Sequence, residues 1–239
     1  MWISDIHTCG SNLDWLNILD TYLPKTESYD PELQDIVQYL RTGEQLTHEQ
    51  GVRLWNHPNL SLVASLADAC KKARFDDQVF FNSNLHVNQT NICTLACKFC
   101  AFRRGRRAKD AYALSVEEFV GRIRPYATLI DEVHTVGGLH PDWDVTYYES
   151  LFSAVKSEFP YIHIKSLSAV EVKHIAEVSG ISPRALLSRL NLAGLDSLPG
   201  GGAEILDDEV RDVICYGKES SDEYISIHRD AHSIGMPTN

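Results

Sequence analysis

The sequence predicts an α/β protein in which a helical N-terminal region precedes a parallel sheet. Two observations support this prediction: apolar residues recur at helical spacing up to residue 78, and strand-like stretches alternate with helix-like ones from residue 79 onward. Alternation of strands and helices is typical of a parallel sheet. We therefore expect a helical region over residues 1–78 and a (βα) region over residues 79–239.

The N-terminal region contains three helical segments. In the first, apolar residues repeat at helical spacing after Pro31, at Leu33, Ile36, Val37 and Leu40. The second begins at Thr47, which has Gln50 three residues later, the spacing of a capping box. A third amphipathic stretch covers residues 60–72. Together these patterns predict a small all-helical unit.

Strands and helices alternate through the remainder of the chain. The expected strands cover residues 79–87, 132–136, 161–167 and, briefly, 196–198. Helices are expected to start at Ser115, residue 147, Ser168, Ser182, Asp207 and Asp222. Because the carboxyl ends of parallel strands meet at one edge, the segments that follow the first three strands should converge.

Composition excludes several classes of protein. The chain has 239 residues, 33 acidic against 22 basic, and a formal net charge of −11. This balance argues against nucleic-acid or membrane-surface binding as the main activity. No apolar run reaches the ~20 residues of a transmembrane helix, and Met1–Asp5 lacks the features of a signal peptide. We expect a cytoplasmic globular protein.

A basic run interrupts this acidic sequence, at Arg103, Arg104, Arg106, Arg107 and Lys109. Three interpretations remain open: a solvated loop, a loop that attracts an anionic substrate, and a nucleic-acid patch. No aromatic residues interleave with the basic ones, as they do in single-strand binders.

Three cysteines lie within eight residues, at Cys93, Cys97 and Cys100, whereas Cys9, Cys70 and Cys215 stand alone. Cysteine thiolates are the usual ligands of iron–sulfur clusters, so three of them can hold three irons of a cubane and leave the fourth iron open. The alternative is a structural zinc site, for which His86 would be the fourth ligand.

The spacing C-x3-C-x2-C, with Phe99 before the last cysteine, resembles the motif of the radical S-adenosylmethionine (SAM) superfamily. The resemblance implies a partial (βα) barrel with the motif on the loop after its first strand. It also implies a [4Fe–4S] cluster whose open iron binds S-adenosylmethionine and whose electron cleaves it to a 5′-deoxyadenosyl radical.

Further segments are similar to one subgroup, the menaquinone and deazaflavin radical enzymes: residues 88–91, 101–102, 137–142, 194–205 and 228–235. Within it, residues 136–141, residues 163–165 and the triple glycine 200–202 most resemble the aminofutalosine synthases. This resemblance implies addition of the adenosyl radical to the enolpyruvyl double bond of 3-[(1-carboxyvinyl)oxy]benzoate. Rearrangement and decarboxylation then give 6-amino-6-deoxyfutalosine for menaquinone biosynthesis.

Three alternatives to that activity remain open. Two are sister enzymes, a dehypoxanthine futalosine cyclase and a subunit of deazaflavin (FO) synthase, which abstract hydrogen and release 5′-deoxyadenosine. The third comes from a different class, a non-catalytic fragment that binds metal.

The resemblance also assigns roles to single residues. It predicts cofactor contacts from Phe99, Gly137, Gly138, Ser168 and Glu204, and it makes His140, Arg229 and His232 candidates for catalysis. Each has a plainer interpretation. The glycine pair can be a simple turn, Phe99 a shield of the cluster, Glu204 a carboxylate favoured by a helix dipole, and Arg229 with His232 a solvated helix face.

The resemblance further implies partners: a small-molecule substrate and a reductant such as flavodoxin or ferredoxin, with no nucleic acid and no membrane. In the family, the stretch around residues 236–239 enters a further strand and the chain continues. We therefore expect an incomplete barrel without its C-terminal strands, either a fragment or one half of a split gene, with a second chain completing the barrel.

Overall fold

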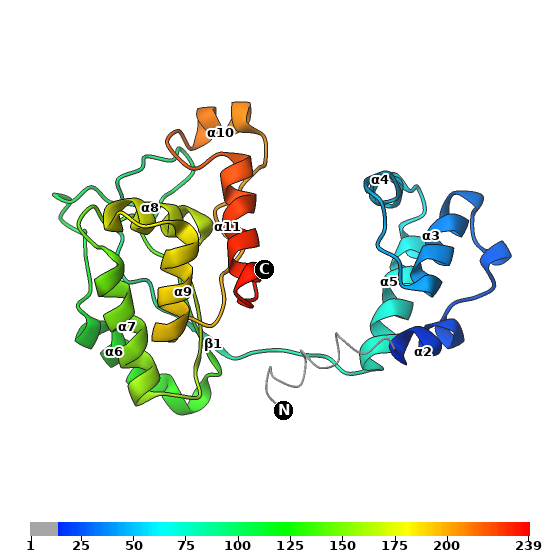
Figure 1. The fold of residues 1–239 in the computed structure, drawn as a ribbon, viewed down its shortest axis with the longest axis horizontal. Helices are drawn as coiled ribbons and strands as arrows, with labels where there is room; N and C mark the ends of the chain where they lie inside the picture. The colour runs from blue at the N-terminus through cyan, green and yellow to red at the C-terminus, as the bar shows by residue number, and fades with distance from the viewer. Residues whose placement is uncertain (1–13) are drawn as a thin grey trace. The chain divides into compact units, whose positions relative to one another are not determined.

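A computed structural model describes residues 14–239 (Figure 1). Cys9 and the Met1–Asp5 segment lie outside the described residues. The chain separates into two compact units, Met1–Phe81 and Asn82–Asn239. None of the described helices is long and apolar enough to cross a membrane.

The first unit is helical in its described part. Its elements are α2 (Asp14–Tyr22), η1 (Thr26–Ser28), α3 (Pro31–Thr42), α4 (His48–Asn56) and α5 (Leu60–Phe75). Asp30 caps α3, and the capping box of Thr47 and Gln50 opens α4, as predicted. Apolar side chains such as Leu33 and Ile36 form a core that is separate from the core of the second unit.

The second unit is built on a parallel sheet in the order β1-β2-β3. Its strands are β1 (Asn84–His86), β2 (Glu132–Thr135) and β3 (His163–Ser166). In the register, Leu85 lies opposite Val133, and Val133 opposite Ile164. An isolated bridge from Lys165 to Ser197 extends the pairing beyond β3. The predicted α/β class with an incomplete parallel sheet is confirmed.

Two expected strands differ from the prediction. Residues 79–83 do not belong to β1, and Val79 and Phe81 are 81% and 90% exposed. Their apolar β-branched and aromatic side chains suggested a strand. Of residues 79–87, however, only 84–86 pair with β2, so the strand is shorter than expected. The brief strand at 196–198 is also wrong, because the residues there form isolated bridges only.

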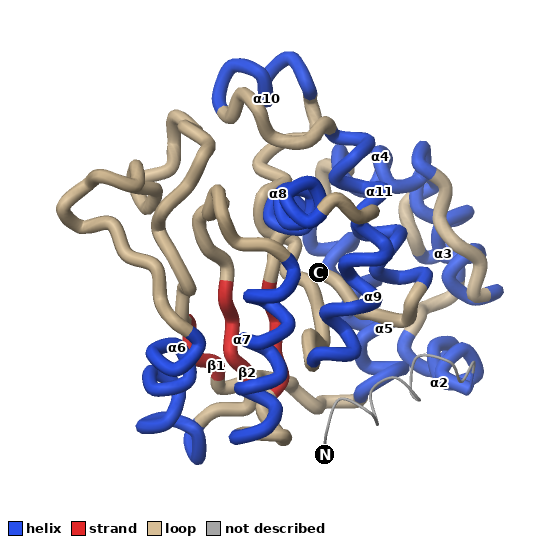
Figure 2. Tube along the Cα trace, turned by 60° about the vertical axis from the view of Figure 1, so that its left-hand side comes forward, coloured by secondary structure: helices blue, strands red, loops and turns tan. Residues whose placement is uncertain are grey.

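Helices follow the strands along the chain. They are α6 (Val116–Ile123), η2 (Arg124–Leu129), α7 (Val145–Glu158), α8 (Ala169–Ser179), α9 (Pro183–Ala193), α10 (Asp208–Ile214) and α11 (Ser221–Ser233). Helices α6 and α7 lie beside the strands (Figure 2). Val133 and Ile164 point into this helical core. Because successive side chains of a strand alternate between faces, Glu132, His134 and Lys165 belong to the other face.

Candidate cofactor site

The loop after β1 carries the three clustered cysteines. Cys93, Cys97 and Cys100 are all half-buried with free thiols. The backbone N–H of Cys100 donates to the carbonyl of Cys97 at 3.2 Å, which closes a turn between them. The N–H of Lys98 donates to the carbonyl of Ile214 at 2.8 Å, which fixes the loop to the end of α10. The loop is therefore held by backbone bonds that leave the sulfurs free.

Burial and the surrounding groups shift the pKa of Cys97. Burial raises the pKa of Cys97, the nearby Cys215, Cys93 and Cys100 raise it further, and Lys218 opposes the shift. Within residues 14–239, no three His, Cys, Asp or Glu side chains are grouped as the ligands of one metal ion. In a cubane each thiolate binds a different iron. Three free thiols on one loop, each able to bind a different iron, fit such a cluster.

Gly138, after β2, lies directly against the cysteine loop. Its N–H donates to the carbonyl of Thr90 at 2.8 Å, and the N–H of Thr94 donates to the carbonyl of Leu139 at 3.1 Å. A Cβ atom at residue 138 would overlap the carbonyl group of Ile92. Only glycine allows this approach, so the second strand end and the cysteine loop form one packed surface.

We expect Gly138→Ala to destabilise this surface, because a methyl group cannot avoid a backbone carbonyl by changing rotamer. The loss should be about 1–3 kcal/mol in the free energy of unfolding, measured by urea denaturation. Gly201→Ala is the control, since a Cβ at residue 201 meets nothing within 4 Å. Equal stability of the two variants would contradict the close packing of residue 138.

Glu171 connects the second strand end to the third. One of its carboxylate oxygens accepts hydrogen bonds from the N–H of Gly137 at 2.8 Å and from Nε2 of Gln89 at 3.2 Å. The other accepts from both the N–H and the hydroxyl of Ser168 at 2.8 Å. Burial raises the pKa of Glu171, whereas these donors favour its ionised form. The predicted capping box at Ser168 is thus also a tie between two candidate cofactor residues.

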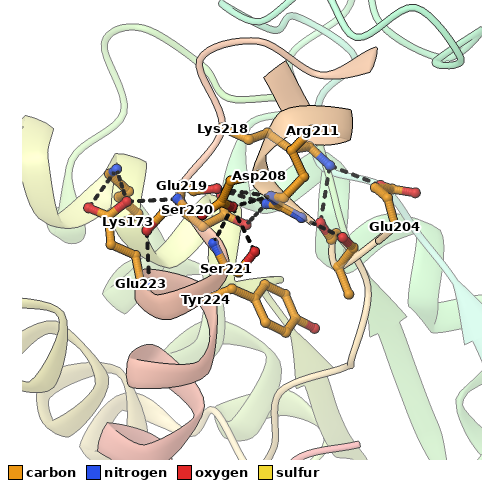
Figure 3. Close-up of polar contacts among 12 residues, drawn as sticks. Lys173, Glu204, Asp208, Arg211, Lys218, Glu219, Ser220, Ser221, Glu223 and Tyr224 are labelled. Atoms are coloured by element: carbon orange, nitrogen blue, oxygen red, sulfur yellow. Dashed lines mark hydrogen bonds and ion pairs between the residues drawn. The ribbon is translucent and has the colours of Figure 1, made fainter. Parts of the chain in front are cut away.

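The glycine loop, residues 200–202, packs against the start of α8. Gly202 has φ +89°, and a side chain there would press against Val170 and Ser168. Beyond it, the carboxylate of Glu204 pairs with Nζ of Lys218 at 2.9 Å (Figure 3). The glycine loop is therefore positioned between the start of α8 and Lys218.

Lys218 returns the chain of contacts to the cysteine loop. Its ammonium pairs with the Glu204 carboxylate and donates a hydrogen bond to the carbonyl of Gly202 at 3.3 Å. This ammonium also lies 5.4 Å from the ring centre of Phe99. Phe99 stands between Cys97 and Cys100 in the sequence. We call this closed series of contacts the cofactor ring. It joins the cysteines to all five predicted cofactor residues: Phe99, Gly137, Gly138, Ser168 and Glu204.

A buried ion pair supports the glycine-loop side of the ring. Arg211 of α10 and Glu219 are 2.9 Å apart, with side chains only 4% and 0% exposed (Figure 3). The Arg211 guanidinium also donates to the carbonyls of Ala203 and Ile205. Sequence reasoning missed Arg211, Glu219 and Lys218, because they belong to no motif identified in the sequence.

The three catalytic candidates have contacts of another kind. His140 is buried and stacks on Trp143 with 4.3 Å between ring centres, and its carbonyl accepts a hydrogen bond from His174 at 2.9 Å. Burial lowers the pKa of His140. Arg229 and His232 are exposed near the end of α11. The contacts of the described residues do not link their side chains to the cofactor ring.

Comparisons with known proteins show the family of the chain. The sequence model of the radical SAM superfamily matches residues 87–239. An aminodeoxyfutalosine synthase from Thermus thermophilus is 35% identical over 211 residues, which cover 88% of this chain and 57% of the relative. An FO synthase from Mycobacterium tuberculosis is 41% identical over 180 residues, 75% of this chain and 21% of that protein.

A solved structure shares the fold of the chain. The crystal structure of a methylornithine synthase has a TM-score of 0.60 at 21% identity, covering 82% of this chain and 55% of that one. The chain spans about half the length of the aminodeoxyfutalosine synthases it matches. It belongs to the radical SAM superfamily, whose members use a [4Fe–4S] cluster and S-adenosylmethionine.

Proposed function

We propose that this chain carries the cofactor site of an aminodeoxyfutalosine (aminofutalosine) synthase. The reaction adds the 5′-deoxyadenosyl group of S-adenosylmethionine to 3-[(1-carboxyvinyl)oxy]benzoate, with rearrangement and loss of a carboxylate, and forms a C–C bond in 6-amino-6-deoxyfutalosine. Similarity to aminodeoxyfutalosine synthases over most of the chain supports the proposal. The product belongs to menaquinone biosynthesis.

The observation that carries the proposal furthest is the polar face of the sheet. Lys165 lies opposite His134 in the register, and its ammonium is 3.4 Å from a carboxylate oxygen of Glu132. His163, on the same strand as Lys165, bonds the hydroxyl of Ser197 at 2.7 Å. Burial lowers the pKa of His134 and of His163, which disfavours their cationic forms. Lys165 is thus a cation on this face and a candidate partner for a substrate carboxylate.

The chain's own residues would hold and orient the reactants. When bound and reduced, for example by a flavodoxin or ferredoxin, the cluster supplies the electron that cleaves S-adenosylmethionine. Cys93, Cys97 and Cys100 would bind the cluster, and the backbone at Gly137 and Gly138 would bind the methionine part. Holding the adenosyl carbon close to the alkene is the main contribution of such a site.

The test is anaerobic reconstitution of the chain with iron and sulfide, followed by reduction with S-adenosylmethionine and the enolpyruvyl benzoate. We expect a product that carries both the adenosyl and the aryl group, detected by mass spectrometry.

Lys165→Met should raise the KM for the benzoate at least tenfold if the ammonium binds a carboxylate. Lys173→Met is the matched control, because Lys173 pairs with Glu223 on the helical side of the unit.

A second candidate has its own support. The higher identity to an FO synthase, over a shorter stretch, favours a reaction of the deazaflavin type. Such enzymes abstract hydrogen, so free 5′-deoxyadenosine without an adduct would support this candidate and contradict aminodeoxyfutalosine synthesis.

A further inference from the structure

Lys218 occupies an unusual place for a lysine. Its side chain is only 8% exposed. Its ammonium bonds the Glu204 carboxylate at 2.9 Å and the Gly202 carbonyl at 3.3 Å, and it faces the ring of Phe99 at 5.4 Å. Buried lysines are rare unless they are paired. This one is paired with residues of the cofactor site on both sides.

The segment that carries Lys218 is packed against the cysteine loop at more than one point. The carbonyl of Ile214 accepts the N–H of Lys98 at 2.8 Å, and Gly217 lies against the side chain of Leu95. The buried ion pair of Arg211 and Glu219 also holds this segment, because Glu219 is the residue directly after Lys218 (Figure 3). The position of the ammonium relative to the cysteines is therefore set by the fold and does not depend on a mobile side chain alone.

The other cations of this region act differently. Arg211 is neutralised by Glu219 at 2.9 Å. Lys98 lies on the cysteine loop but is exposed, so water and salt screen its charge. Lys218 has a partner too, the Glu204 carboxylate, but that side chain is 31% exposed and the ammonium is not. Water and salt therefore screen the charge of Lys218 less than that of Lys98.

We propose that Lys218 is a positioning residue of the cofactor site, which orients Glu204 and Phe99 and raises the reduction potential of the cluster bound by the cysteine loop. Reduction adds one negative charge to a cluster, and a fixed positive charge beside it stabilises the reduced form. Glu204 opposes this effect in part, so the two residues should shift the potential in opposite directions.

The experiment is a redox titration of the reconstituted full chain, followed by electron paramagnetic resonance without S-adenosylmethionine or substrate. We expect Lys218→Met to move the midpoint potential to a more negative value and Glu204→Gln to move it to a more positive one. Lys218→Arg keeps the charge and should stay near the wild type. Lys173→Met, which removes a lysine paired with Glu223, should not shift the potential.

Each outcome decides the matter. An unchanged potential in Lys218→Met, or a potential of Lys218→Arg as low as that of Lys218→Met, overturns the proposal. If Lys218→Met does not assemble a cluster, Glu204→Gln decides: a more positive potential supports the proposal and an unchanged one overturns it. Because no substrate is present, the result is independent of which reaction the enzyme catalyses.

The positioning role has a separate readout in cofactor affinity. In Lys218→Met the Glu204 carboxylate loses the partner that holds it beside the glycine loop. We expect the Kd for S-adenosylmethionine, measured by calorimetry on the oxidised cluster form, to rise several-fold and to be restored by Lys218→Arg. An unchanged Kd in Lys218→Met would contradict the positioning role.

Discussion

Cys97→Ala is expected to abolish assembly of the iron–sulfur cluster. The wild-type chain, reconstituted without oxygen, should contain about four irons and four sulfides. Cys97 is the middle one of the three predicted ligands on the loop. Removal of one of three protein ligands leaves two irons of the cubane without one. Iron and acid-labile sulfide analysis, together with the visible absorption of the cluster, measures the loss.

Cys70→Ala is the matched control for this variant. Cys70 is also half-buried and free, but it lies on α5 in the first unit. It should retain the wild-type iron and sulfide content. A full cluster in Cys97→Ala would refute the ligand assignment, and one zinc per chain without sulfide in the wild type would favour the structural zinc site instead.

Glu171→Ala is expected to cost about 3 kcal/mol in the free energy of unfolding, measured by urea denaturation. The carboxylate accepts four hydrogen bonds, from Gly137, Gln89 and two groups of Ser168. An unsatisfied buried donor costs about 1–3 kcal/mol. Relief of the buried carboxylate's own desolvation offsets part of that sum.

The same variant should loosen one particular part of the site. Hydrogen exchange should accelerate in peptides that contain Gly137 and Ser168, because their N–H groups lose the acceptor. Glu177→Ala is the control, since Glu177 is exposed on the same helix. If Glu177→Ala and Glu171→Ala were equally stable and exchanged alike, the hydrogen bonds of Glu171 between the two strand ends would not contribute to stability.

The local features of the fold were predictable from short stretches of sequence. The capping boxes of Thr47, Ser115 and Ser168 all open helices, because a cap depends on residues three positions apart. Strands β2 and β3 lie inside the predicted ranges 132–136 and 161–167. The prediction of a strand at residues 79–83 was wrong for a different reason: a strand forms only where a partner strand, distant in the sequence, pairs with it.

Candidate cofactor residues were also predictable where they follow strands. Parallel strands bring their carboxyl ends to one edge. Gly137 and Ser168 do meet there through Glu171, and Gly138 packs against the cysteine loop. The roles of these residues in binding stay predictions. The same reasoning does not apply to Arg229 and His232, which lie on a helix and are exposed. The contacts of the described residues do not link them to the cofactor ring.

The sequence by itself determined the α/β class, the helix starts and the cysteine spacing, because each depends on neighbours along the chain. Only the tertiary structure revealed the closure of the cofactor ring. Gln89 reaches Glu171 across 82 residues, and Lys218 reaches Phe99 from the far end of the chain. Such contacts arise from packing between distant segments, and a buried charge acquires its effect only from the medium and the partners that packing places around it.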